Sequence, residues 1–502
     1  MAKAQAQAEA PAAAEASAAG ADEANLLDQI IDGGAFREAE DDAEKERNRQ
    51  YFKEFLKTIV KPGQVLSKDV EGFIKYQIGE IDKKLSVQLN EVLHTPEFQK
   101  LEGTWRGLSY LVHNTETGVD LKIRVLNAKK KDVLGDIEKA VEFDQSNLFK
   151  SIYETEYGVL GGTPYGLLVA DYEFDRSADD LTVLRGLSNI AAASHAPLVS
   201  NAAPKLFSMN RFSELSNPRD LAKVFDTPEY AGWQSFRESE DSRYAALCMP
   251  RVLGRLPYGA ESKPVSEFNY EEGVDGKDHD KYLWMGAAWA YAARVTSAYK
   301  SDGWFSRTRG VEGGGKVEGL PVSTFKTDQG DVAMKCPTEV AITDRREFEL
   351  SNLGFMPLIH AKGKDFAVFI GTQSCQKAKK YFDAEANSNA ELSTKLNLIL
   401  NTSRFAHYLK VMARNWLGKQ MEPGECESKL NLWIQNYVLD NPSMAGDRLK
   451  AERPLQAARI EVKGDPKRPG YYDAIAYLRP HYQLEALSAS LRLVASVPKQ
   501  KA

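Results

Sequence analysis

The sequence predicts a mixed α/β (α+β) fold for the body of this 502-residue chain. Three observations support this prediction: helical and strand patterns interleave from about residue 61, 43% of the residues are hydrophobic, and a strand-loop-strand pattern lies near the C-terminus. At about 150 residues per domain, the length corresponds to roughly three domains. This much apolar material supports a sizeable core and excludes a collagen-like, coiled-coil or wholly disordered protein.

The first 60 residues are expected to form an N-terminal arm. Residues 1–24 are rich in alanine and almost without large apolar groups, which predicts a disordered tail. Residues 25–34 predict about two turns of helix, because two i,i+4 apolar pairs precede Gly33 and Gly34. These pairs are Leu26 with Ile30 and Leu27 with Ile31. Two interpretations stay open: a capping helix on the protein's own core, or a recognition helix that docks in a partner's groove.

The main domain is expected to span residues 61–370. Thr95 as N-cap and Pro96 at the first helical position predict a helix start. At helical spacing, one face of this helix carries Phe98, Leu101, Trp105, Leu108 and Val112. Alternation over 121–125 predicts a half-buried strand, and apolar runs at 166–170 and 366–370 predict short buried strands.

The C-terminal domain is expected to span residues 371–502. A long amphipathic helix is predicted near residue 390, with apolar positions at Leu392, Leu396, Ile399 and Leu409. In the strand-loop-strand unit, the apolar residues Ala458, Ile460 and Val462 alternate with Arg459, Glu461 and Lys463. Such a charged outer face is a common defence of an exposed strand. After a loop at 464–470, the second strand carries Tyr472, Ala474, Ala476 and Leu478, and an amphipathic helix follows over 482–497.

Composition excludes several classes of protein. The formal charge of −6 gives no support for nucleic-acid binding. The chain has four widely spaced cysteines and no C-x-x-C motif: Cys248, Cys336, Cys375 and Cys426. This pattern argues against a disulfide scaffold or a zinc ribbon and favours reduced thiols. The N-terminus lacks the apolar region of a signal peptide, and the longest uncharged run, 186–204, is too polar to span a bilayer. We therefore expect a cytoplasmic protein without membrane insertion.

The best catalytic candidate is a degenerate nucleotide loop. Gly310 to Lys316 matches G-x-x-x-x-G-K, but Val317 stands where a Mg²⁺-binding Ser or Thr is required, and no helix pattern follows. Seven scattered histidines show no metal-binding spacing, and G-x-S-x-G is absent. Two acidic groups are interpreted as solvated: Asp171 with Glu173 and Asp175, and Asp275 with Asp278 and Asp280 around His279. We expect no enzyme activity, metal or cofactor, with a nucleotide-binding enzyme as the alternative.

Several separated stretches, in this order and spacing, resemble the large subunit of the bacterial type VI secretion contractile sheath, the VipB/TssC family. The similarity covers about residues 25–498. Its stretches are Leu26-Leu27-Asp28 with Ile30-Ile31, Pro96 to Leu108 (PEFQKLEGTWRGL), Pro250-Arg251 with Arg255 to Gly259 (RLPYG), Cys336 to Val340 (CPTEV), and Arg479 to Glu485 (RPHYQLE) with Ser490 to Val494 (SLRLV).

The resemblance implies a structural role: a phage-tail-sheath-like body with a disordered arm and a C-terminal strand-exchange module. In that family the large subunit pairs with a small sheath subunit (VipA/TssB-like). The pairs polymerise helically from a baseplate around an Hcp inner tube, contract to propel it, and are dismantled by the AAA+ unfoldase ClpV. The resemblance assigns unfoldase recognition to Leu26, Leu27, Ile30 and Ile31, and intersubunit pairing to the two C-terminal strands. Glu485 and Arg492 of the last helix are candidates to face the inner tube. A chaperone-recruiting adaptor without a polymer is a further possibility.

Overall fold

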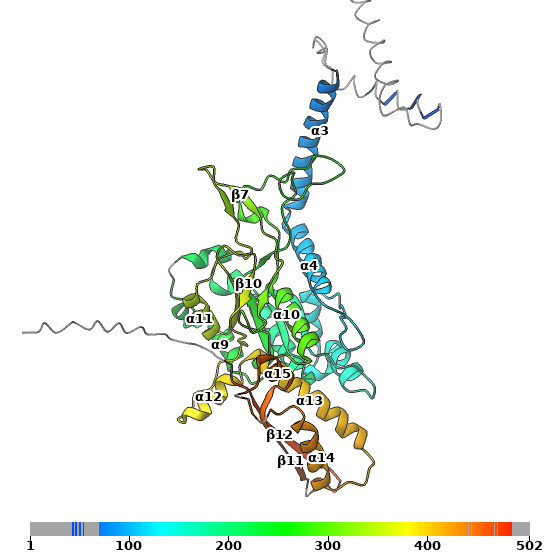
Figure 1. The fold of residues 1–502 in the computed structure, drawn as a ribbon, viewed down its shortest axis with the longest axis vertical. Helices are drawn as coiled ribbons and strands as arrows, with labels where there is room; N and C mark the ends of the chain where they lie inside the picture. Colours follow the sequence, from blue (N-terminus) through cyan, green and yellow to red (C-terminus); the bar gives the residue numbers. More distant parts are fainter. Residues whose placement is uncertain are drawn as a thin grey trace, which may run out of the picture. The chain divides into compact units, whose positions relative to one another are not determined.

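The computed structural model describes residues 43, 44, 46, 47, 50, 51, 54, 70–217, 219–276, 278–439, 441–442, 444–465, 467–468 and 470–483 (Figure 1). The chain divides into two compact units, Met1–Val87 and Gln88–Ala502. Most of helix α3 (Val70–Leu93) belongs to the first unit. The predicted tail and the short helix at 25–34 lie outside the described residues. The helices and strands from α4 onward belong to the second unit.

A six-stranded mixed sheet forms the centre of the second unit. Its strands lie in the order β1-β2-β3-β9-β10-β6. The first four are parallel, and β10 pairs antiparallel with both β9 and β6. The strands are β1 (Leu168–Phe174), β2 (Leu198–Ala202), β3 (Ala245–Met249), β9 (Phe355–His360), β10 (Ala367–Phe369) and β6 (Lys316–Val317). The mixed α/β class and the strands predicted at 166–170 and 366–370 are confirmed.

Two helices cover opposite faces of this sheet. Along β2, Leu198 packs in one core with α7 (Ala178–Ser194), whereas Val199 packs in another core with α10 (Ala287–Asp302). Successive strand side chains point to opposite faces, so a strand between two helical layers is buried throughout. All five residues of β2 are buried accordingly.

Helix α4 (Pro96–His113) begins where the sequence predicts, but its buried face is not the apolar row. Gly103, Gly107 and Leu111 are its buried residues. A Cβ at Gly103 would lie 2.7 Å from the carbonyl oxygen of Trp284, so the helix backbone approaches the body closely at this point. The side chain of Trp105 in the apolar row is 62% exposed.

Two predicted elements differ in the structure. Residues 121–125 lie outside every helix and strand. The single helix predicted near residue 390 is two helices, α12 (Ala384–Leu392) and α13 (Leu396–Trp416). They are separated because the intervening backbone bonds to another segment: Ser374 N–H donates to the Thr394 carbonyl, and Leu396 N–H donates to the Thr372 carbonyl.

The remaining elements lie around the sheet and in a C-terminal module. Around the sheet are α5 (Lys130–Lys139), α6 (Asn147–Phe149) with a π-helical stretch (Lys150–Tyr157), α8 (Leu221–Phe225), α9 (Ala231–Glu238), α11 (Asp344–Asn352), β4 (Val252–Leu253), β5 (Trp284–Met285), β7 (Thr324–Lys326) and β8 (Val332–Met334). The module comprises α13, α14 (Pro423–Gln435), α15 (Asp447–Glu452), β11 (Leu455–Gly464) and β12 (Tyr472–Pro480). A core that includes Phe405, Ile434 and Ile460 holds it together.

No helix among the described residues has the length and apolar character needed to cross a bilayer.

Candidate functional site at the C-terminal hairpin

Strands β11 and β12 form an antiparallel hairpin that pairs with no other strand of the described chain. Ile460 lies opposite Ala476, Ala458 opposite Leu478, and Val462 opposite Ala474. Cross-strand neighbours share a face, and this face packs on α13 and α14: Ile460 is fully buried. Strand alternation therefore places all seven strand residues singled out from the sequence on one face of the hairpin. Five of them pack in the core, whereas Ala474 is exposed.

Tyr472, the seventh, lies at the start of β12, and its hydroxyl donates to the Met421 carbonyl at 2.8 Å. The charged outer face predicted for β11 is also present. The side chain of Glu461 pairs with Arg459 at 3.0 Å and with Lys463 at 3.6 Å. Opposite these charges on β12, Ile475 and Tyr477 are 43% and 52% exposed.

The free edge of β11 is closed by side chains of α14. The Ile460 N–H donates to Asn431 Oδ1 at 2.9 Å, and Asn431 Nδ2 donates to the Ile460 carbonyl at 2.7 Å. Glu427 accepts from the Val462 N–H at 3.0 Å, and Gln435 donates to the Ala458 carbonyl at 3.2 Å.

This match follows from two regular spacings. Four residues of helix rise about 6 Å, and two residues of strand about 6.7 Å. Side chains at positions 427, 431 and 435 can therefore follow the strand edge at positions 462, 460 and 458. The sequence analysis did not identify Glu427, Asn431 and Gln435 as a row that pairs with β11. The regular i, i+4, i+8 spacing of one acidic and two amide side chains could have indicated it.

Within the described residues, the outer edge of β12 is unpaired. The backbone groups of Ile460 point toward α14, so its pair with Ala476 is of the non-hydrogen-bonded kind. The N–H and C=O groups of Ala476 consequently point away from β11, as do those of Ala474 and Leu478. No other strand of the described chain covers this edge. An unpaired row of this kind is a template for a strand from another chain.

Other predicted site residues cannot be placed. Leu26, Leu27, Ile30 and Ile31, and also Glu485 and Arg492, lie outside the described residues.

The Gly310–Lys316 segment does not form a phosphate cradle. It leads into strand β6 rather than a helix, and the Gly310 N–H donates to the Phe369 carbonyl at 2.7 Å. Lys316 Nζ pairs with Glu318 and lies 4.3 Å from the ring centroid of Phe366. The lysine of a P-loop lies at the N-terminus of a helix and must be free to reach the phosphates, whereas Lys316 lies in strand β6.

The acidic residues at β1 have a basic partner that the sequence did not reveal. Arg251 contacts both carboxylate oxygens of Glu173, at 2.5 and 2.8 Å. It also lies 3.6 Å from Glu339, whose pKa is raised to about 7 by burial. Burial likewise raises the pKa of Asp171. The Asp175 carboxylate accepts from the Ser177 N–H at 2.7 Å, next to the start of α7.

A buried charge cluster is centred on Arg255. Its guanidinium donates to Glu102 of α4 at 2.8 Å and to Glu272 at 2.7 Å. The Arg255 and Glu272 side chains are 4% and 0% exposed. Sequence stretches that are far apart along the chain thus meet in buried ion pairs that brace the body.

The loop around His279 is not wholly a surface excursion. Asp280 pairs with Arg211 and Asp278 with Lys281, but His279 itself is partly buried against Trp284, with ring centroids 4.9 Å apart. Burial lowers the His279 pKa to about 4. Among the described residues, no group of three His, Cys, Asp or Glu side chains is placed to hold a metal.

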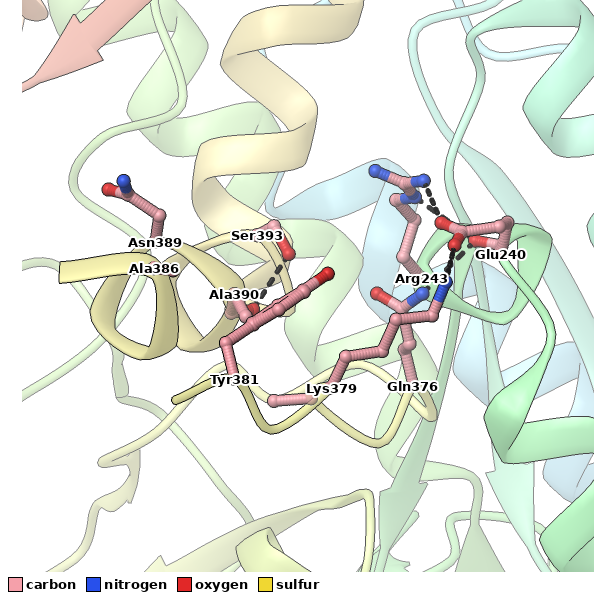
Figure 2. Close-up of a pocket in the computed structure, with 10 residues that line it drawn as sticks. Glu240, Arg243, Gln376, Lys379, Tyr381, Ala386, Asn389, Ala390 and Ser393 are labelled. Atoms are coloured by element: carbon pink, nitrogen blue, oxygen red, sulfur yellow. Dashed lines mark hydrogen bonds and ion pairs between the residues drawn. The ribbon is translucent and has the colours of Figure 1, made fainter. Parts of the chain in front are cut away.

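Figure 2 shows a pocket of about 400 Å³ next to α12. Its charged side chains are already paired: Glu240 accepts from Arg243 at 2.6 Å and pairs with Lys379. Ser393 donates to the Ala390 carbonyl at 2.7 Å. We assign this pocket no role, because its charged groups neutralise one another.

Comparison with known proteins gives two matches to family models. The model VipB, described as EvpB/VC_A0108, tail sheath N-terminal domain, matches residues 75–376. The model VipB_2, described as EvpB/VC_A0108, tail sheath gpW/gp25-like domain, matches residues 385–497. The type VI secretion system sheath protein TssC1 of Pseudomonas aeruginosa strain PAO1 is 50% identical over 462 residues, which cover 91% of this chain and 93% of that protein.

Two solved structures are more distantly similar. The baseplate of the anti-feeding prophage matches with a TM-score of 0.37 and 11% identity, over 75% of this chain and 83% of that one. The contracted helical sheath of the same prophage matches with a TM-score of 0.31 and 12% identity, over 62% and 66%. At scores this low, the assignment depends on the sequence comparisons alone.

Proposed function

This chain belongs to the VipB/TssC family of type VI secretion sheath proteins, and we propose that it works as the large subunit of a contractile sheath. It pairs with a small VipA/TssB-like subunit, and the pairs polymerise helically from a baseplate around an Hcp inner tube. Contraction propels this tube, and a ClpV-like AAA+ unfoldase then recycles the subunits. The protein acts in the cytoplasm.

The observation that carries the proposal is the asymmetry of the C-terminal hairpin. Asn431 closes the β11 edge, whereas the backbone of Ala476 faces outward on the β12 edge. A subunit that joins a polymer by strand exchange needs one receptive edge, since two would permit unordered pairing. The β12 edge accepts a strand from a neighbouring subunit.

Main-chain hydrogen bonds suit the mechanical task of a sheath. They hold a strand along its length and do not depend on the angle between the two rigid bodies that it connects. Subunits linked in this way can rotate against one another during contraction while the chain-to-chain link persists. The free energy of contraction comes from repacking of subunit interfaces in an extended lattice.

The two ends of the chain have separate roles in this proposal. The segment with Leu26, Leu27, Ile30 and Ile31 is the helix that the unfoldase recognises, presented on an arm spanning residues 1–60. The body spans 61–370, and the module at 371–502 carries the exchanged strands. Its last helix faces the inner tube through Glu485 and Arg492.

A pair of proline variants tests the receptive edge. Ala476→Pro removes an N–H from the open edge, whereas Ile475→Pro removes one from the β11–β12 ladder. With the small subunit co-expressed, electron microscopy should show tubules for wild type. Ala476→Pro should abolish the tubules and leave a folded chain; Ile475→Pro should unfold the hairpin. Normal tubules from Ala476→Pro would refute pairing at this edge, and wild-type subunits that stay dispersed would refute the sheath assignment.

The arm is tested with Leu27→Asp combined with Ile30→Asp. Two carboxylates on the apolar stripe should abolish binding of the unfoldase without affecting assembly, whereas deletion of residues 1–24 should change little. Unchanged affinity in the double variant would remove the recognition helix from the proposal.

We propose no catalytic activity. A nucleotide-binding enzyme would show saturable nucleotide binding that is lost in Lys316→Ala. We expect no binding at millimolar nucleotide, because Lys316 is engaged by Glu318 and Phe366 on a strand.

A further inference from the structure

Helix α4 presents an apolar row to solvent. Phe98, Leu101, Trp105 and Val112 are 36%, 54%, 62% and 44% exposed. They lie three, four and seven residues apart, so they share one face, and the opposite glycine-bearing face is the one that packs on the body. A continuous row of large apolar side chains on a helix that is already packed marks an interaction surface.

The chain next to this row has the pattern of a strand without a partner. Leu121, Ile123 and Val125 alternate with Lys122 and Arg124, yet the segment 121–127 belongs to no helix or strand. Within the described residues, the backbone of 122–127 makes no hydrogen bond to the protein, so its N–H and C=O groups are available to a partner strand. The alternating pattern predicts a strand, but the described residues supply no partner strand for it.

The C-terminal end of the helix row, at Val112, and the unpaired segment border one groove. A cavity of about 530 Å³ is lined by Leu108 and Val112 of α4 and by Leu121, Ile123 and Val125 of the segment. Arg124 points the other way: its guanidinium donates to Thr163 Oγ1 at 3.1 Å and pairs with Glu156. Leu121, Ile123 and Val125 line the groove together with Lys122.

The surroundings of the segment are basic. Lys122, Lys129 and Lys131 are exposed and make no ion pair with a carboxylate of the described chain, and Asp120 and Asp132 are the acidic residues among them. A complementary strand therefore carries apolar residues on alternate positions and acidic residues on the others.

We infer that this groove is the docking surface for the small sheath subunit, which contributes a β-strand that pairs with residues 121–127 and covers the apolar row of α4. The inference rests on the proposed function, which supplies the partner. It adds the surface and the kind of element that the partner presents: an acidic, alternating strand. It is separate from the hairpin edge, which joins neighbouring pairs in the polymer.

The test measures the affinity of the purified small subunit for the full chain. Trp105→Ser combined with Val112→Ser should weaken binding at least tenfold. Phe348→Ser is the matched control, because Phe348 is an aromatic residue on α11 with a similar exposure of 67%. It should leave the affinity within twofold of wild type.

Two adjacent prolines test the strand pairing. Val125 and Leu126 are 67% and 68% exposed, so neither substitution removes core packing. Consecutive N–H groups of an extended chain point to opposite sides, and only one of them can face the partner strand. One of Val125→Pro and Leu126→Pro should therefore weaken binding at least tenfold, and the other less than threefold. Equal affinities of the two variants would overturn strand pairing.

The outcomes separate this inference from the proposed function. If wild type does not bind the small subunit at all, the proposed function fails. If it binds and Trp105→Ser with Val112→Ser behaves like Phe348→Ser, only the docking surface fails. Self-association of the chain alone that is lost in the double serine variant would show a second copy in the groove and would equally overturn the inference.

Discussion

The backbone of Gly107 lies directly against the indole ring of Trp289. A Cβ at this position would overlap the Cδ1 and Nε1 atoms of the ring. Gly107 thus brings α4 against α10 by backbone rather than by side chains, and Gly103 one turn earlier brings it in the same way against β5. The close approach explains why the large apolar residues of α4 are left on the other side.

Gly107→Ala should destabilise the body. The added methyl group forces Trp289 or the helix to move, and overpacking of this kind costs about 1–3 kcal/mol. Chemical denaturation of the full chain measures the effect. Gly135→Ala in α5 is the control, because a Cβ there meets nothing within 4 Å and alanine favours a helix by up to about 1 kcal/mol. Equal stability of the two variants would contradict the close packing of α4.

Asn431→Leu should loosen the β11 edge. The leucine has a similar size but leaves both the N–H and the C=O of Ile460 without a partner, at a cost of about 2–4 kcal/mol. Hydrogen exchange at the Ile460 amide should accelerate in step with the lower free energy of unfolding. Gln435→Leu should cost less than about 1 kcal/mol, since Gln435 is exposed and water replaces its bond to Ala458. An unchanged exchange rate at Ile460 would show that Asn431 does not hold this edge.

Arg255→Met should be among the most damaging single substitutions. It leaves the buried Glu272 carboxylate without its cation, which costs about 3–5 kcal/mol. Adding Glu272→Gln should recover part of this loss by removing the uncompensated charge. Arg106→Met, which breaks a more exposed pair with the same Glu102, should cost less than about 1 kcal/mol. Thermal or urea unfolding of the three variants would reveal any failure of this order.

Acid should weaken the contact between α7 and α13. The ring centroid of His407 in α13 lies 6.3 Å from that of His195 at the end of α7. The Nε2 atom of His407 lies 2.9 Å from the Ser194 carbonyl oxygen. Burial lowers the His407 pKa to about 4, whereas an unfolded histidine titrates near 6.5. Unfolding therefore takes up a proton in this window, so the stabilisation is complete above pH 6.5 and is lost as the pH falls toward 4.

His407→Gln keeps a donor for Ser194 and removes the titrating group. Between pH 7.5 and 4.5, the free energy of unfolding of wild type should fall by about 2–3 kcal/mol more than that of the variant. Other buried histidines such as His279 contribute equally to both proteins and cancel in the difference. Parallel pH profiles would contradict a neutral, buried His407.

Local patterns predicted many elements correctly. Pro96 at the first helical position marks the start of α4, and the alternation at 458–462 marks β11, because a proline ring and the period of side chains act over a few residues. Thr95 precedes the helix, but its hydroxyl donates to the Glu91 carbonyl and does not cap α4. The pattern failed at 121–125. A strand exists only when something pairs with it, and nothing in the described chain does.

The sequence by itself determined the class of fold, the hairpin with its charged outer face, and the family. Only the tertiary structure decided that α4 packs by Gly103 and Gly107, and that Asn431 closes one hairpin edge while Ala476 leaves the other open. Periodicity tells which residues share a face of an element. Which face or edge is covered depends on how closely other elements approach and which groups they bring, and those elements are distant along the chain.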